Sequence, residues 1–176
     1  MSLALNQIDR IALLCDFLTH PEIQTAINRS VPVTMPHDIG SLGFDTHLWV
    51  GLGTVGLWSA LDAFADRATF SKPKSKCQTC DRPSCLWSRL SAAGTISAAQ
   101  ALALKELEDV RHLFAHNYAG QADAMYFGPR KRHVFSSGVR VSLSSGAVFD
   151  GAFLVLNAAH LRYYADQSRQ IVRSLS

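Results

Sequence analysis

Charged residues are scarce in this chain of 176 residues. They make up 18% of it, whereas hydrophobic residues make up 48%, and this balance is typical of a folded globular protein. The length suits one domain with a sizeable core and is too short for two domains of ordinary size. The net charge of +3 allows an anionic partner without requiring one.

Long hydrophobic runs are absent as well. The most apolar stretch, LWVGLGTVGLWSAL, lies between His47 and Asp62. It is too short to cross a bilayer, and its glycines weaken a lone helix. The first residues, MSLALNQIDR, lack the basic segment and continuous apolar run of an export signal. We therefore expect a cytoplasmic protein without a membrane partner, whose four cysteines are reduced thiols or metal ligands.

Apolar residues recur with helical spacing in four segments. The predicted helices cover about residues 3–19, 45–69, 97–120 and 152–175. In the third, Ser97 and Gln100 form the S-x-x-Q capping box, and Gly120 is a natural stop. Its predicted core stripe consists of Ala99, Ala103, Leu107, Val110 and Phe114.

Two connecting segments are not predicted to be helical. Residues 71–90 read as a polar loop, and residues 133–150 alternate apolar and polar positions around Ser-Gly turn signals. The predicted fold is one all-α domain, an up-down four-helix bundle with a small β-hairpin inserted before the last helix.

The segment GLGTVG, residues 51–56, matches the G-x-G-x-x-G pattern of dinucleotide-binding proteins. That function needs a buried strand before the glycines and an acidic residue about twenty positions later. The preceding FDTHLWV is a poor strand, and SKPKSK, where the acidic residue should fall, contains none. We instead expect Gly51, Gly53 and Gly56 to let the second helix approach its neighbours closely.

The polar loop contains three cysteines, Cys77, Cys80 and Cys85, with the spacing C-x2-C-x4-C. Such spacing can present thiolates to a structural zinc ion, which requires four ligands. The candidates for the fourth ligand are Cys15, His20, His37 and His133, and the alternative is a loop of free thiols.

The same loop is basic and is a candidate surface for RNA. Its cationic residues are Lys72, Lys74, Lys76, Arg82 and Arg89. Trp87 either stacks on a base, as in single-strand binders, or anchors the loop to the core. A second basic cluster, Arg130, Lys131 and Arg132, lies further along the chain.

The end of the third helix, VRHLFAHNYAG, concentrates groups that suit RNA cleavage. A histidine titrates near neutrality, so His116 can take a proton from a 2′-hydroxyl or give one to the leaving oxygen. Arg111 stays charged and can bind phosphate oxygens with two nitrogens at once. The plainer interpretation is that basic residues favour the C-terminal end of any helix. One helix does not aim Arg111 and His116 at a single atom, but a two-fold dimer would collect two of each in one cleft.

The string ELEDVRHLFAHNYAG resembles the signature of HEPN domains. In these domains an arginine, a polar residue, three further residues and a histidine end the third helix of a four-helix bundle. Arg111 and His116 match the catalytic pair, and Tyr118 falls where an aromatic residue often follows. His112 stands where an asparagine is common, which is a departure from the pattern. The resemblance covers about residues 105–120.

The resemblance implies a homodimeric, metal-independent endoribonuclease, often the toxin of a toxin–antitoxin pair or a phage-defence effector. RNA and an antitoxin protein are then the expected partners, and catalysis needs no cofactor. We expect His112 and Asn117 to position substrate or tune His116, and Asp109 either to orient an imidazole or to be a plain surface residue. Two alternatives remain: a non-catalytic bundle that binds a protein or nucleotide, and a zinc-stabilised nucleic-acid-binding domain.

Overall fold

The computed structural model describes residues 3–30, 44–68, 86–116, 144–150 and 153–176. Most of these residues are helical, which confirms the all-α class. The helices are α1 (Leu3–Thr19), α2 (Pro21–Ser30), α4 (Phe44–Ala68), α5 (Leu86–Ala93), α6 (Ala98–His116) and α8 (Ala158–Leu175). Two short strands, β1 (Val148–Asp150) and β2 (Phe153–Val155), pair antiparallel before α8.

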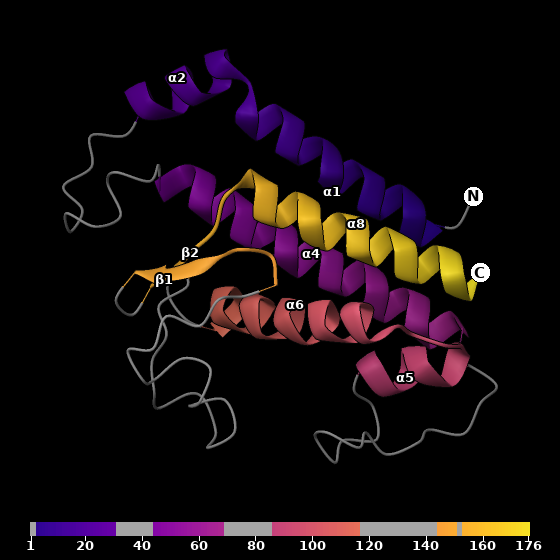
Figure 1. Cartoon of the computed structure of the whole chain (residues 1–176). Helices are drawn as coiled ribbons and strands as arrows, with labels where there is room; N and C mark the ends of the chain where they lie inside the picture. The colour runs from indigo at the N-terminus through magenta and orange to yellow at the C-terminus, as the bar shows by residue number, and fades with distance from the viewer. Residues whose placement is uncertain (1–2, 31–43, 69–85, 117–143, 151–152) are drawn as a thin grey trace.

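The long helices pack side by side around one apolar core. Helix α4 contacts α1, α6 and α8, and α8 also contacts α1 and α6. Figure 1 shows that consecutive long helices run in opposite directions and that both termini lie at the same end of the molecule. The largest fully buried side chains come from all of these helices and include Ile8, Leu57, Leu61, Leu107 and Leu161.

The glycine-rich pattern lies inside α4. The strand and turn that dinucleotide binding requires around these glycines are therefore replaced by a continuous helix. Each glycine faces a different neighbour. A Cβ at Gly51 would clash with Phe114 of α6, one at Gly53 would lie 2.5 Å from Leu161 of α8, and one at Gly56 would lie 3.1 Å from Ile11 of α1. The expected close approach of helices is confirmed, and α4 is the helix around which the others gather.

Helix α6 begins where the capping box predicts. The Gln100 amide nitrogen donates to the Ser97 hydroxyl at 3.2 Å, and the Ser97 amide nitrogen donates to the Gln100 side chain at 2.8 Å. Of the predicted stripe, Ala103, Leu107 and Val110 are buried and Phe114 packs against the core, but Ala99, in the first turn, is exposed.

The last helix starts later than predicted, at Ala158 instead of residue 152. Asn157 caps it: its side chain accepts hydrogen bonds from the Ala159 and His160 amides, and His160 Nδ1 accepts from the Asn157 amide at 3.0 Å. The cap turns the chain out of β2, in which Leu154 pairs with Phe149. The predicted hairpin at about 133–150 is not confirmed, because residues 133–143 lie outside the described part and the observed strand pair lies further along the chain.

The predicted polar loop also ends earlier than expected, because residues 86–93 form α5. Leu86 and Leu90, four residues apart, are both buried in the core. Their helical spacing on one face supplies the apolar side that this short helix needs. Trp87 and Arg89 therefore belong to a helix and not to a loop, although the Trp87 side chain lies outside the described part.

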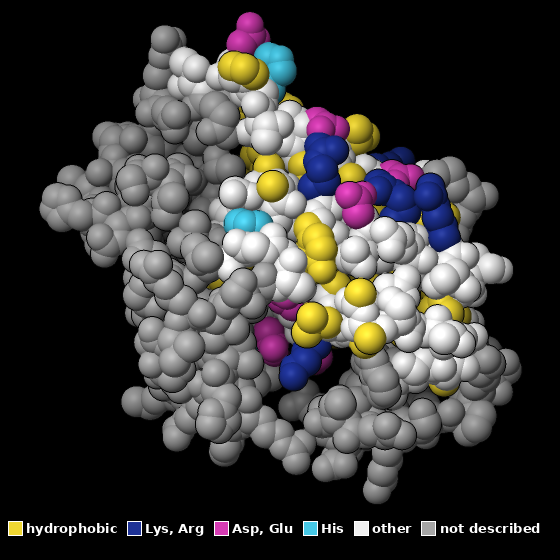
Figure 2. All heavy atoms as spheres, viewed as in Figure 1, with side chains coloured by type: hydrophobic (Ala, Val, Ile, Leu, Met, Phe, Trp, Pro, Cys, Tyr) yellow, Lys and Arg dark blue, Asp and Glu magenta, His cyan; other side chains and the backbone are white. Residues whose placement is uncertain are grey.

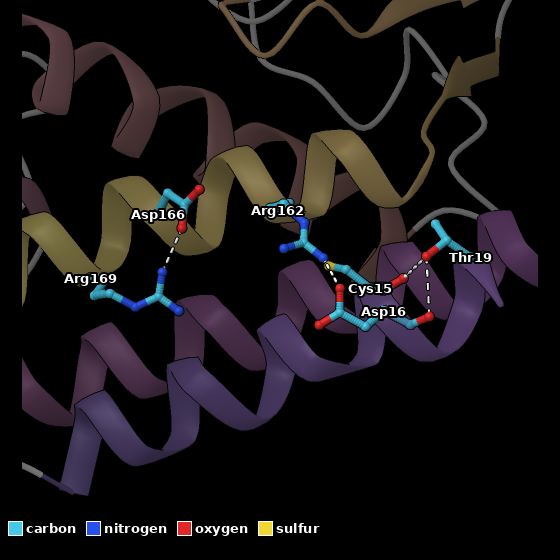
Figure 3. Close-up of polar contacts among 6 residues, drawn as sticks. All are labelled: Cys15, Asp16, Thr19, Arg162, Asp166 and Arg169. Carbon is cyan, nitrogen blue, oxygen red and sulfur yellow. Dashed lines mark hydrogen bonds and ion pairs between the residues drawn. The ribbon is translucent and has the colours of Figure 1, made fainter.

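Ion pairs join α1 to α8 on the outside of the molecule. Figure 2 shows the acidic and basic side chains side by side on this face. Figure 3 shows the pair of Arg162 with Asp16, which joins the two helices, and the pair of Arg169 with Asp166, which lies within α8. Arg162 binds Asp16, while Arg169 binds Asp9 at 2.8 Å and Asp166 at 2.5 Å. Because most of these side chains are partly or largely exposed, each pair stabilises the fold only slightly and mainly sets how α1 lies on α8.

Candidate functional site

The C-terminal half of α6 carries the candidate catalytic pair. Arg111 lies within the described part, whereas only the backbone of His116 does, as the last residue of α6. Asn117 and Tyr118 lie outside the described residues. The structure therefore shows the surroundings of Arg111, and the His116 imidazole lies outside the described residues.

Arg111 is half-buried against α4. Its guanidinium carbon lies 5.3 Å from the ring centroid of Trp58, within the range of a cation–π contact. The Nε atom is buried and has no hydrogen-bond acceptor in the described structure. No carboxylate among the described residues forms an ion pair with this guanidinium. An aromatic face therefore lies against this positive charge.

The two other polar residues predicted beside Arg111 are both engaged by the fold. His112 is half-buried and has an interaction partner. Asp109 is only 8% exposed and also has a partner, so the prediction of a plain surface aspartate is wrong. It is buried because it shares the inner side of α6 with Glu106, one turn earlier.

Arg89, predicted to bind RNA, is used inside the fold instead. Its terminal nitrogens bind two carboxylates of α4, Asp62 and, at 2.5 Å, Asp66, which lies one turn after Asp62. The Arg89 side chain is only 11% exposed. A guanidinium that is held by two carboxylates on a neighbouring helix has little left for phosphate. This pairing corrects the predicted role: Arg89 joins α5 to α4.

Most of the other predicted ligands of RNA and zinc lie outside the described residues. This holds for the remaining basic residues of the loop, for the cluster at 130–132 and for Cys77, Cys80 and Cys85. Cys15 and His20, two candidates for the fourth zinc ligand, lie within the described part, and His20 is exposed. Cys15 is completely buried in the core, where burial raises the pKa of its thiol. Within the described part of the chain, no three His, Cys, Asp or Glu residues come together as a metal site would require.

A second polar cluster, which the sequence did not predict, surrounds Glu106 of α6. Its carboxylate accepts hydrogen bonds from the backbone amides of Ser144 at 2.8 Å and Ser145 at 3.2 Å, and from both serine hydroxyls. The Tyr164 hydroxyl of α8 donates to it at 2.6 Å. Five donors on one buried carboxylate tie the turn before β1 to two helices.

Ionisation in this cluster follows from those contacts. Burial by itself raises the pKa of Glu106, but the hydrogen bonds from Ser144, Ser145 and Tyr164 outweigh it and hold the pKa below its ordinary value. Burial, together with the nearby carboxylate, raises the pKa of Tyr164. Burial lowers the pKa of His160 although the Gly146 backbone and Glu106 oppose it. At neutral pH the carboxylate is charged and the phenol is neutral.

One signal in the sequence could have revealed this cluster. Glu106 lies three positions after Ala103 and four before Val110, so it interrupts the apolar stripe of the third helix. A carboxylate on the buried side of a helix needs several donors to remain there. The structure provides them from residues 144 and 145 and from Tyr164, far away in the sequence.

A groove of about 380 Å³ lies elsewhere, between α1 and α4. Gln7, Arg10 and Ile11 line one wall, and Gly56, Ser59 and Ala60 line the other. None of the predicted catalytic residues lines it. No helix in the described ranges is long and apolar enough to cross a membrane.

Comparisons with protein-family models, with curated proteins and with solved structures find no match to this chain.

Proposed function

We propose that this protein is a metal-independent endoribonuclease of HEPN type, with α1, α4, α6 and α8 as its four-helix bundle. The observation that carries the proposal is the environment of the Arg111 guanidinium. The guanidinium of this residue lies on an indole ring, and its buried Nε has no hydrogen-bond acceptor in the described structure. A guanidinium that lies on an aromatic face near the end of α6 suits a phosphate oxyanion.

The proposed reaction is attack by the 2′-hydroxyl of RNA on the adjacent phosphorus. A His116 imidazole takes the proton of the attacking hydroxyl, and another gives a proton to the departing 5′-oxygen as its bond to phosphorus breaks. Arg111 binds the non-bridging oxygens, on which negative charge builds in the pentacoordinate state. The products are a 2′,3′-cyclic phosphate and a 5′-hydroxyl.

A homodimer supplies both imidazoles in this proposal. The ends of two α6 helices meet across a two-fold axis, so the cleft between them holds two copies of Arg111 and His116. His112 and Asn117 position substrate or tune His116. The basic residues of 72–82 and 130–132 bind the RNA backbone, so binding weakens as salt rises. A toxin or defence role, with an antitoxin as partner, follows from the resemblance and belongs to the same proposal.

The proposal is tested by alanine substitutions at Arg111 and His116. Each is expected to lower the rate of RNA cleavage at least about 100-fold, the range for a lost acid, base or oxyanion-stabilising group. Arg10→Ala on α1 is the matched control, because Arg10 is exposed and lies on another helix. The melting temperature and circular dichroism of each variant report folding. Cleavage that survives both substitutions in folded protein, or that requires added metal, contradicts the proposal.

A further inference from the structure

We infer that Trp58 of α4 is a positioning residue for Arg111, holding its guanidinium so that the terminal nitrogens stay open to an RNA phosphate. The inference rests on the proposed endoribonuclease function and adds a residue to it that the sequence pattern does not contain. Trp58 lies 53 positions before Arg111, on another helix.

The contact itself is the first part of the argument. Trp58 is half-buried and packs against the core, so its ring is a fixed surface and not a mobile surface group. With its carbon 5.3 Å from the ring centroid, the Arg111 guanidinium is attracted by the electron-rich face of the indole. An aromatic face offsets part of the cost of burying the charge without occupying the N–H groups that would bind phosphate.

Arg89 offers a comparison on the same helix, because its guanidinium has a purely structural role against α4. Both arginines contact α4, and both have a buried Nε without an acceptor in the described structure. The terminal nitrogens of Arg89 are taken by Asp62 and Asp66. Arg111 meets an indole where Arg89 meets carboxylates. Among the described residues, the two arginines therefore meet α4 in different ways, and the one on the indole is assigned to an anion.

Packing between α4 and α6 fixes the position of the contact. Phe114, three residues after Arg111, fills the space left by the missing side chain of Gly51. One turn of α6 is thereby held against α4 at two points, Phe114 on Gly51 and Arg111 on Trp58. A rigid backbone on both sides is what a positioning contact requires.

The test compares Trp58→Phe and Trp58→Leu with the wild type. Phenylalanine keeps a weaker aromatic face, whereas leucine keeps only apolar packing. We expect both kcat for RNA cleavage and the affinity for RNA to fall in the order Trp, Phe, Leu, with kcat of the leucine variant about 5- to 30-fold below wild type. Trp49→Leu, an exposed tryptophan on the same helix, is the matched control and should leave kcat unchanged.

A double-mutant cycle separates positioning from general packing. The cycle measures binding of a labelled 2′-O-methyl oligoribonucleotide, which cannot be cleaved, to Trp58→Leu, Arg111→Ala and the double variant. If Trp58 acts through Arg111, the leucine substitution weakens binding in the wild type but has no further effect once Arg111 is alanine. Equal losses in both backgrounds, or equal kcat for the phenylalanine and leucine variants, overturn the inference.

The same cycle distinguishes this inference from the proposed function. A wild type that binds the oligonucleotide but does not cleave RNA refutes the nuclease, while the cycle still decides whether Trp58 acts through Arg111. A wild type that neither binds nor cleaves refutes both. Melting temperatures of all variants establish that folded protein is compared.

Discussion

Replacing Glu106 by glutamine tests whether this buried carboxylate holds the turn before β1 against α6 and α8. Oε1 accepts from the Ser145 amide, the Ser145 hydroxyl and Tyr164, and Oε2 accepts from the amide and hydroxyl of Ser144. Glutamine keeps the shape but replaces one oxygen by an NH₂ group, which cannot accept a hydrogen bond. A hydroxyl can turn to adapt, whereas a backbone amide cannot.

The expected loss follows from that count of donors. At least one backbone amide, from Ser144 or Ser145, loses its acceptor, which costs about 1–3 kcal/mol. The remaining hydrogen bonds change from a charged to a neutral acceptor and weaken by up to about 1 kcal/mol each, and the lower cost of burying a neutral amide offsets part of that loss. We expect Glu106→Gln to lower the free energy of unfolding by about 2–4 kcal/mol at pH 7.

Acid should remove this difference. The folded pKa of Glu106 lies below its ordinary value of 4.5, so the charged carboxylate stabilises the fold fully above that pH. The contribution is lost as the pH falls through the lowered folded pKa, and the wild type then approaches the glutamine variant. Urea unfolding at pH 7 and at several pH values below 4.5 measures the difference in the free energy of unfolding between the wild type and Glu106→Gln.

Glu22→Gln is the control for that series, because Glu22 is exposed on α2 and should change stability by less than about 0.5 kcal/mol. A Glu106→Gln variant as stable as wild type at pH 7 would refute the assigned role. A difference in the free energy of unfolding that stays constant on acidification would refute the lowered pKa of Glu106.

Three further predictions concern single residues. Gly53→Ala should be less stable than Gly56→Ala by about 1–2 kcal/mol in urea unfolding, because its Cβ meets the fully buried Leu161; equal stabilities would contradict the packing. Asn157→Ala should cost about 1 kcal/mol in thermal or urea unfolding, since it removes the N-cap of α8; an unchanged midpoint would count against the cap. Alkylation mapped by mass spectrometry should reach Cys15 only on unfolding, since its thiol is buried and has a raised pKa, and rapid labelling of native protein would contradict this.

Local signals in the sequence predicted the start of α6 and the bounds of α1 correctly. Ser97 and Gln100 act within one turn, and the apolar spacing over residues 3–19 is likewise a local pattern. The start of α8 was missed because its cap, Asn157, follows an apolar run that suits a strand or a helix equally.

The surroundings of the candidate site depend on contacts that are distant in the sequence. Trp58 and Arg111 belong to different helices, as do Arg89 and its partners on α4. Glu106 meets Ser144 after 38 residues and Tyr164 after 58. Composition and spacing identify the residue types but not these partners, so the role of Arg89 was predicted wrongly and the Glu106 cluster was not predicted.

The chemical form of the cleaved RNA tests the central proposal most directly. In buffer that contains EDTA, the wild type should cut an oligoribonucleotide to give a 2′,3′-cyclic phosphate and a 5′-hydroxyl. A single 2′-deoxy nucleotide at the cut position should block that cut. End-group analysis by mass spectrometry reads both results. Products with a 5′-phosphate and a 3′-hydroxyl, or equal cutting at the 2′-deoxy position, would contradict cleavage by Arg111 and His116 through the 2′-hydroxyl.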